Sequence, residues 1–79
     1  MLKIYGAEWC GPCRDTKKFL DENNVDYTYI NIDDDGNQEL INQKEINSIP
    51  YCEVYDADNN IITTRIGSIT TLKELEEVL

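Results

Sequence analysis

The sequence predicts an α/β fold in which a four-stranded mixed sheet is flanked by helices, with the element order β-α-β-α-β-β-α. The first observation behind this prediction is a strand–helix–strand pattern near the N-terminus, which normally gives parallel neighbouring strands. The second is a pair of strand-like runs around a turn-rich segment, which is typical of an antiparallel hairpin. The third is a helical pattern that follows a capping signal near the C-terminus. We expect residues 1–79 to form one domain, because so short a chain has room for one modest core.

The N-terminal part of the chain predicts the strand–helix–strand unit. Leu2–Tyr5 is a short apolar-rich run that ends at Gly6, as expected of a buried strand followed by a turn. Gly11–Asn24 contains good helix formers, and Pro12 stands near the first turn, where its missing N–H is harmless. Val25–Ile32 is β-branched and aromatic, which indicates a second strand.

The rest of the chain predicts a helix, a hairpin and a last helix. Asn37–Asn47 is a weaker helix that ends before Ile49-Pro50, because the residue before a proline disfavours helical geometry. Tyr51–Tyr55 and Ile61–Ile66 flank a turn-rich segment and should pair as a hairpin. Thr71-x-x-Glu74 is a capping box. Apolar residues then recur at helical spacing to the chain end: Leu72, Leu75, Val78 and Leu79.

The composition is strongly acidic, with 7 Lys and Arg against 16 Asp and Glu and a formal net charge of −9. This charge argues against binding to nucleic acid or an anionic membrane, and it favours a monomer that is drawn to basic patches on partner proteins. No stretch approaches the roughly 18 apolar residues of a membrane span. The N-terminus lacks the basic and apolar regions of a signal peptide, so we expect a cytoplasmic protein.

The chemistry of the sequence is concentrated in Cys10-Gly11-Pro12-Cys13. Cysteines three apart on a helix face have Cβ atoms about 5–6 Å apart, which is close enough to form a disulfide with little rearrangement. Cys10 stands at the helix start, where unpaired N–H groups and the helix dipole favour the thiolate, so its pKa should lie below that of a free cysteine. Cys13 lies one turn deeper, where burial opposes ionisation. This inequality makes Cys10 the attacking thiol and Cys13 the resolving one.

The same cysteine spacing also occurs in zinc sites, but a zinc site needs a second pair of Cys or His ligands. This chain has one further cysteine, Cys52, and no His, so no metal is predicted. Cys52 is interpreted as a small buried strand residue rather than a third redox thiol. The odd cysteine count and the close spacing also argue against the disulfide scaffold of a secreted mini-protein.

Trp9-Cys10-Gly11-Pro12-Cys13 matches the thioredoxin active-site motif in full, while the element order and the length resemble glutaredoxin. The chain thus resembles a small glutaredoxin-like protein with a minimal thioredoxin fold and a thioredoxin-type motif. The resemblance implies a cis bond at Ile49-Pro50 facing the dithiol, whereas the residues alone favour trans, because only a few per cent of X–Pro bonds are cis. It also implies a substrate groove around Cys10, formed by Trp9, Gly11, Pro12, Ile49, Pro50, Gly67 and Ser68. From the residues alone, Gly67 is as readily a turn residue and Trp9 a packing aromatic.

The same resemblance implies a thiol–disulfide oxidoreductase that reduces protein disulfides through a Cys10 mixed disulfide, which Cys13 resolves. It implies no tightly bound cofactor. Glutathione or a thioredoxin-reductase-type flavoenzyme is the implied reductant, and ribonucleotide reductase is the first protein substrate that the family suggests. Two positions depart from the family pattern. Ile4 stands where thioredoxins carry a buried Asp that helps to deprotonate the resolving cysteine, and Thr70-Thr71 stand where glutaredoxins carry an acidic pair that holds glutathione.

Two other functions remain open at this stage. The first is a redox-inert interaction subunit that holds a partner in the groove of Trp9, Ile49 and Pro50. The second is cluster or metal binding through Cys10, shared between two chains. A double Cys10 and Cys13 serine variant that keeps the biological activity would favour the interaction subunit, and visible absorbance after reconstitution with iron and sulfide would favour the cluster.

Overall fold

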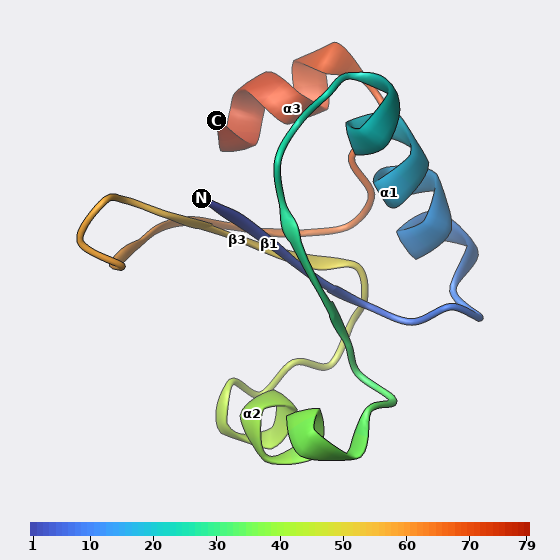
Figure 1. Ribbon diagram of the computed structural model, residues 1–79, viewed down its shortest axis with the longest axis vertical. Coiled ribbons are helices and arrows are strands. Elements are labelled where there is room, and N and C mark those ends of the chain that lie inside the picture. The colour runs from blue at the N-terminus through green and yellow to red at the C-terminus, as the bar shows by residue number, and fades with distance from the viewer.

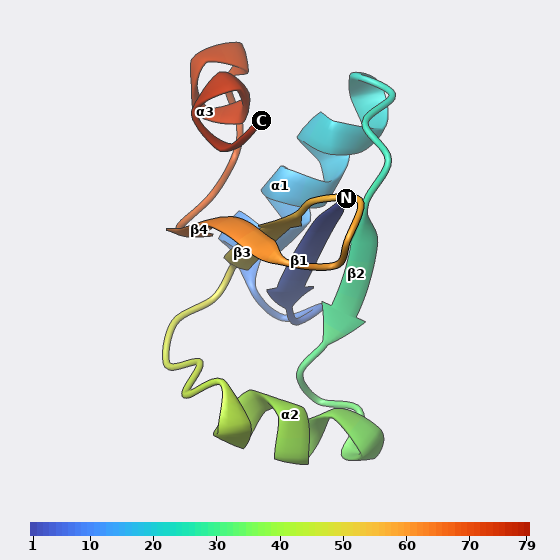
Figure 2. The same ribbon diagram turned by 90° about the vertical axis from the view of Figure 1, so that its left-hand side faces the viewer.

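The structure, a computed structural model, describes residues 1–79 and has the predicted α/β architecture. A four-stranded sheet with the order β2-β1-β3-β4 separates α1 and α3 on one side from α2 on the other (Figure 1, Figure 2). The elements are β1 (Leu2–Gly6), α1 (Gly11–Glu22), β2 (Thr28–Asn31), a 3-10 turn η1 (Asp35–Asn37), α2 (Gln38–Gln43), β3 (Tyr51–Tyr55), β4 (Ile61–Ile66) and α3 (Leu72–Val78).

The apolar core lies between the sheet and the helices α1 and α3. β1 pairs in parallel with β2 and antiparallel with β3, and β4 adds to the outer side of β3 in antiparallel orientation. In this register Ile4 lies opposite both Tyr29 and Cys52. Because side chains alternate between the two faces of a strand, the even-numbered residues of β1 and β3 all point into this core. The buried core residues are Leu2, Ile4, Leu20, Cys52, Val54, Ile69, Leu75 and Val78.

The opposite face of the sheet is organised by a buried carboxylate. Glu53 is 1% exposed, and its oxygens accept hydrogen bonds from the Tyr5 hydroxyl at 2.9 Å, the Tyr55 hydroxyl at 2.7 Å and Lys44 Nζ at 2.9 Å. Burial by itself would raise the pKa of Glu53, but the three donors outweigh it and hold the pKa below its usual value. Lys44 follows α2, so the carboxylate fastens this helix to the sheet.

The strand β2 is shorter than the predicted strand over Val25–Ile32. The first residues of that range terminate α1 instead. Asn24 takes a positive φ of 56°, and the Val25 amide donates to the Leu20 carbonyl at 3.0 Å. This pattern is the Schellman ending of a helix, which satisfies carbonyls that the last turn leaves free. The predicted helix over Gly11–Asn24 accordingly ends at Glu22.

The predictions for the other two helices also need correction. The helix expected over Asn37–Asn47 is α2, which ends at Gln43 because Glu45 takes a φ of 54° and the Ile46 amide donates to the Ile41 carbonyl at 3.2 Å. In α3 only Leu75 and Val78 are buried, whereas the flanking leucines Leu72 and Leu79 are 62% and 69% exposed. None of the helices is both long and apolar enough to pass through a lipid bilayer.

Candidate active site

The site begins where β1 ends and α1 starts. Cys10 is the N-cap of α1, with extended backbone angles of φ −89° and ψ 111°, and Pro12 occupies the first turn. The sulfur of Cys10 accepts a hydrogen bond from the backbone N–H of Cys13 at 3.2 Å. A capping atom at this position receives N–H groups that have no partner inside the helix and lies at the positive end of the helix dipole. The helix start therefore favours a negative charge on this sulfur, as the sequence predicted.

Cys10 and Cys13 are joined by a disulfide, and their Cα atoms are 5.2 Å apart. The two residues differ in accessibility, since Cys10 keeps 7% of its surface exposed and Cys13 none. Both pack with Ala7 into a small buried cluster, against which Ile32 and Ile49 lie. An external sulfur can therefore reach Cys10 more readily than Cys13.

Gly6, the last residue of β1, leaves the space that the deeper cysteine occupies. A Cβ atom on Gly6 would stand 2.8 Å from Cys13 Sγ and 2.5 Å from the hydroxyl oxygen of Tyr29. The contact with sulfur is closer than real Cβ atoms accept, so only glycine fits here. Sequence analysis identified Gly6 as a turn residue, and its second role in making room for Cys13 comes from the packing.

The segment Ile49-Pro50 lies beside the dithiol and contains the cis peptide bond that the family resemblance implied. Pro50 is buried, and its carbonyl accepts a hydrogen bond from the Gly67 amide at 2.9 Å. Gly67 has a φ of +116°, a conformation that only glycine adopts readily, so Gly67 is required here for the turn of the backbone. The structure thus brings Ile49, Pro50 and Gly67 together on one side of Cys10.

Trp9 is an exposed member of the site, with 67% of its surface accessible. Its indole N–H donates to the Asp33 carboxylate at 2.6 Å, which fixes the ring next to Cys10. The sequence contains no signal that Asp33, 24 residues further along the chain, would hold the tryptophan. Trp9 is therefore a surface aromatic rather than a packing residue of the core.

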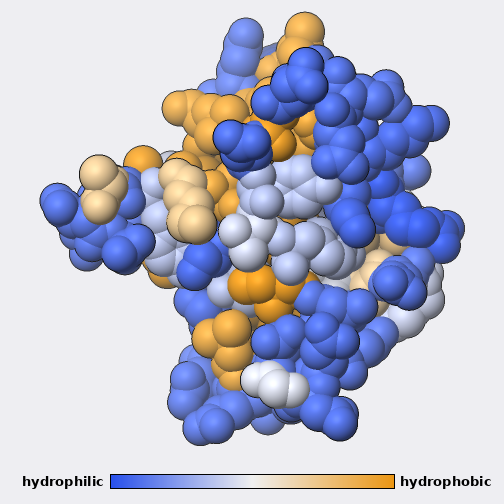
Figure 3. Space-filling view, viewed as in Figure 1, coloured by the Kyte–Doolittle hydropathy of each residue, from blue (hydrophilic) through white to orange (hydrophobic).

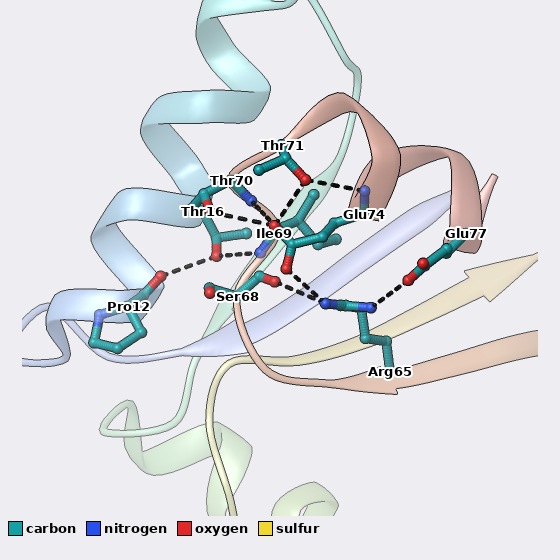
Figure 4. Close-up of polar contacts among 9 residues, drawn as sticks. All are labelled: Pro12, Thr16, Arg65, Ser68, Ile69, Thr70, Thr71, Glu74 and Glu77. Carbon is teal, nitrogen blue, oxygen red and sulfur yellow. Dashed lines mark hydrogen bonds and ion pairs between the residues drawn. The ribbon is translucent and has the colours of Figure 1, made fainter.

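A buried hydroxyl connects the first turn of α1 to the loop that follows β4. Thr16 is fully buried; its Oγ1 donates to the Pro12 carbonyl at 2.9 Å and accepts from the Ile69 amide at 3.0 Å (Figure 4). Nearby, Arg65 donates to the Ser68 carbonyl at 3.2 Å and to Glu74 at 2.8 Å. The loop Gly67–Ile69 is consequently held from the redox helix on one side and from β4 on the other. Gly67 and Ser68 were predicted as site residues, whereas no sequence pattern indicated Thr16.

Cys52 is separated from this chemistry by burial. It is the one free cysteine, lies in β3 with 1% of its surface exposed, and packs in the apolar core. Burial raises the pKa of the Cys52 thiol to about 11, against a smaller lowering effect of Arg65. The thiol stays protonated at neutral pH, and the prediction that Cys52 is a packing residue is consistent with this position.

The sequence was compared with known protein families and with curated proteins. Residues 2–56 match the Glutaredoxin family. The chain belongs to the thioredoxin/glutaredoxin family. It is 34% identical over 74 residues to thioredoxin 1 of Plasmodium falciparum, covering 90% of this chain and 71% of that protein. It is also 33% identical over 64 residues to a glutaredoxin-like 8.6 kDa protein of the rubredoxin operon in Clostridium pasteurianum, covering 78% of this chain and 81% of that protein.

Solved structures of this family have the same fold. A crystal structure of Plasmodium falciparum thioredoxin superposes with a TM-score of 0.70 and 26% identity, covering 96% of this chain but only 65% of that chain. A thioredoxin-like protein superposes over 100% of both chains with a TM-score of 0.64 and 22% identity, which bears on the fold alone. The chain thus spans about two thirds of the thioredoxin and all of the smaller relative. Membership of the thioredoxin/glutaredoxin family and a CxxC pair at disulfide distance support a redox oxidoreductase role.

Two departures from the family pattern are visible in the structure. Ile4, which replaces the acidic residue of thioredoxins, is fully buried in β1 and brings no carboxylate under the dithiol. At the start of α3 the hydroxyls of Thr70 and Thr71 donate to Glu74 Oε1 at 3.3 and 3.0 Å, and Thr71 caps the helix. The site therefore has no acidic side chain at position 4, 70 or 71.

Proposed function

We propose that this protein is a dithiol electron carrier that reduces protein disulfides. The observation that carries the proposal is the asymmetry of the dithiol: Cys10 Sγ caps α1 and receives the Cys13 N–H, and Cys10 alone of the two cysteines keeps exposed surface. A sulfur that the helix start stabilises as a thiolate and that solvent can reach is suited to attack an external disulfide.

The reaction has two exchange steps. The Cys10 thiolate attacks one sulfur of the substrate disulfide, the substrate S–S bond breaks, and the released substrate thiolate takes up a proton. Cys13 then loses its proton and attacks Cys10 Sγ, which breaks the mixed disulfide and releases the second substrate thiol. The protein is left with the Cys10–Cys13 disulfide and the substrate has gained two electrons and two protons. The second step is intramolecular, and the 5.2 Å separation of the two Cα atoms allows it without a change of backbone.

The surroundings of Cys10 support an extended peptide as the substrate. The backbone N–H and C=O of Ile49 form no backbone hydrogen bond within the chain, so both are free to pair with a bound strand. The exposed ring of Trp9, the residue before Cys10, offers a further apolar contact. The surface view is mostly hydrophilic, with apolar side chains beside α3 and between the sheet and α2 (Figure 3). With a net charge of −9, the protein should select substrates with basic surroundings.

Reduction of insulin disulfides by dithiothreitol, followed by turbidity, tests the proposed chemistry. We expect the Cys10→Ser variant to lose the catalysed rate and the Cys13→Ser variant to accumulate the mixed disulfide on Cys10. Cys52→Ser is the matched control, because this thiol is buried in the core and its loss should leave the rate unchanged. Full activity of the Cys10→Ser variant would refute the proposal.

The reductant and the protein substrate need separate experiments. We propose glutathione or a thioredoxin-reductase-type flavoenzyme as the reductant, and coupling the purified protein to each system shows which sustains turnover. Thr70 and Thr71 stand in place of the acidic pair that holds glutathione in glutaredoxins, which favours the flavoenzyme. By analogy with the family, ribonucleotide reductase is the first protein substrate to test, with this protein as the only electron donor.

A further inference from the structure

The resolving step of the proposed function contains an electrostatic difficulty. Cys13 must become a thiolate while none of its surface is exposed. The side chains that pack in its cluster are apolar, namely Ala7, Ile32 and Ile49. Burial in such surroundings disfavours the charged form of a thiol. Some polar group must therefore reach the sulfur when the proton leaves.

The hydroxyl of Tyr29 and the sulfur of Cys13 are both close to the space beside Gly6. Both atoms lie within 3 Å of the point where a Cβ on Gly6 would stand, with Tyr29 Oη at 2.5 Å and Cys13 Sγ at 2.8 Å. They border the same gap, which the missing glycine side chain leaves, and no hydrogen bond joins them while the disulfide is closed. The position of Tyr29 follows from the β1–β2 register, in which it lies opposite Ile4 on the face that α1 covers.

The hydroxyl of Tyr29 is also free to act as a donor. The hydroxyls of Tyr5, Tyr27 and Tyr55 each donate to a carboxylate, whereas the Tyr29 hydroxyl donates to no other group of the chain while the disulfide is closed. Its ring is held in place from above by Lys17 Nζ, 4.2 Å from the ring centroid. A disulfide sulfur is a weak acceptor and a thiolate is a strong one, so Cys13 becomes a strong acceptor for this hydroxyl when it ionises.

We propose that Tyr29 is a positioning residue for the resolving step, and that its hydroxyl donates a hydrogen bond to the Cys13 thiolate. The inference rests on the proposed function. The proton of Cys13 leaves to water, the thiolate accepts the Tyr29 hydrogen bond, and the sulfur then attacks Cys10 Sγ. The departing substrate thiolate takes up a proton from water in turn. Tyr29 keeps its own proton throughout.

The charges around the pair are consistent with this role. Lys17 comes from α1, one helical turn after Cys13, and Glu8 comes from the segment before the helix. Burial, and secondarily the charge of Glu8, raise the pKa of Tyr29 above its ordinary value. The hydroxyl is therefore protonated at every pH at which a thiol exchanges, and it remains a donor.

A titration of Cys13 tests the inference directly. In the Cys10→Ala variant, the pH at which half of the Cys13 thiol is ionised is read from its ¹³Cβ chemical shift. Adding Tyr29→Phe should raise this pH by about one unit, the size expected for one hydrogen bond to a charged group. Tyr27→Phe is the matched control: it removes a hydroxyl that is bound to Asp21 and should leave the midpoint unchanged. Equal midpoints for the Tyr29→Phe and parent proteins would overturn the inference.

The unmutated protein provides a second measurement, which does not depend on the folding of a variant. The ¹³Cζ resonance of Tyr29 should shift as Cys13 ionises in the reduced protein, and a resonance that stays constant over this range would contradict the inference. In single-turnover release from the mixed disulfide, Tyr29→Phe should slow resolution about tenfold at pH 7 and leave the formation of the mixed disulfide unaffected. A protein that forms no mixed disulfide would refute the proposed function, whereas the two titrations would still decide the role of Tyr29.

Discussion

Replacement of Thr16 by valine tests how the loop Gly67–Ile69 is held against the redox helix. Valine matches the shape of threonine, so the change removes the hydroxyl without opening a cavity. The Ile69 amide then loses its acceptor at 3.0 Å in a fully buried position. A buried amide without a partner costs about 1–3 kcal/mol. The Pro12 carbonyl belongs to an exposed residue, and water can replace its lost donor.

The expected result is a lower melting temperature and a locally loosened loop. For a chain of this length, a loss of about 2 kcal/mol lowers Tm by about 10 °C. Thermal unfolding followed by circular dichroism measures this loss, and hydrogen exchange of the Ile69 amide shows where it arises. Thr16→Ser is the control: it keeps the hydroxyl, gives up one methyl group worth about 1 kcal/mol, and should leave the Ile69 amide protected. If Thr16→Val melts like the unmutated protein and its Ile69 amide exchanges as slowly, the buried bridge has no part in holding the loop.

Three further predictions concern the rest of the fold. Lys44→Met should destabilise the protein by roughly 2 kcal/mol at pH 7, because Glu53 keeps its charge and loses a partner that is itself partly exposed. The pKa of Glu53 is lowered in the folded protein, so the ionised carboxylate contributes its full stabilisation above pH 4.5 and loses it as the pH falls through the folded-state pKa. Urea unfolding should therefore show that the difference in stability between Lys44→Met and the parent disappears below the folded-state pKa. A difference in stability that grows at acid pH would contradict the ion pair. Gly6→Ala should cost about 1–3 kcal/mol by the same measurement, because its Cβ would press on Cys13 Sγ, and an alanine variant as stable as the parent would disprove this packing. Thr71→Ala removes the cap of α3 and should lower stability by about 1 kcal/mol, with Thr71→Ser close to the parent.

The elements that the sequence predicted with the right bounds are those with local signals. The hairpin strands β3 and β4 run over the predicted residues because turn chemistry between them limits both ends. The cap of α3 forms as its Thr71-x-x-Glu74 pattern indicated, with the Glu74 amide donating to Thr71 Oγ1 at 3.1 Å. The N-cap position of Cys10 likewise follows from a strand, a short turn and a proline in the next turn. Each of these features depends on residues within a few positions of one another.

The errors at helix ends have a shared physical cause. Asn24 and Glu45 both take a positive φ, and in each case the next amide returns to a carbonyl five residues earlier. Asparagine is a common residue at this helix ending, but glutamate is not, so the sequence did not indicate that α2 ends before Glu45. Val25 was therefore assigned to a strand by its β-branched side chain, although its amide completes the helix.

The contacts that organise the site join residues far apart in the chain. Trp9 is held by Asp33, Thr16 by Ile69, and Gly6 makes room for both Cys13 and Tyr29. None of these partners has a spacing that a helix or a turn would reveal, because each depends on the strand register and on the packing of α1 over the sheet. The Cys10-Gly11-Pro12-Cys13 motif predicts which residues react, but the strand register and the packing of α1 determine which side chains surround them.

The alternation of β1 explains why this small chain can keep a polar network and a redox centre apart. Ile4 faces the core under α1, whereas Tyr5 faces the opposite side and binds Glu53. The buried carboxylate and its lysine thus lie across the sheet from the dithiol, where the charge serves to attach α2. Had Ile4 been acidic, a charge would have stood in the apolar core on the side of the sheet that α1 covers. With isoleucine at position 4, the Cys13 thiolate needs a neutral hydrogen-bond donor. The pairing of β1 with β2 places the Tyr29 hydroxyl beside Gly6, in the space that Cys13 Sγ also borders, and this hydroxyl is the donor that we propose.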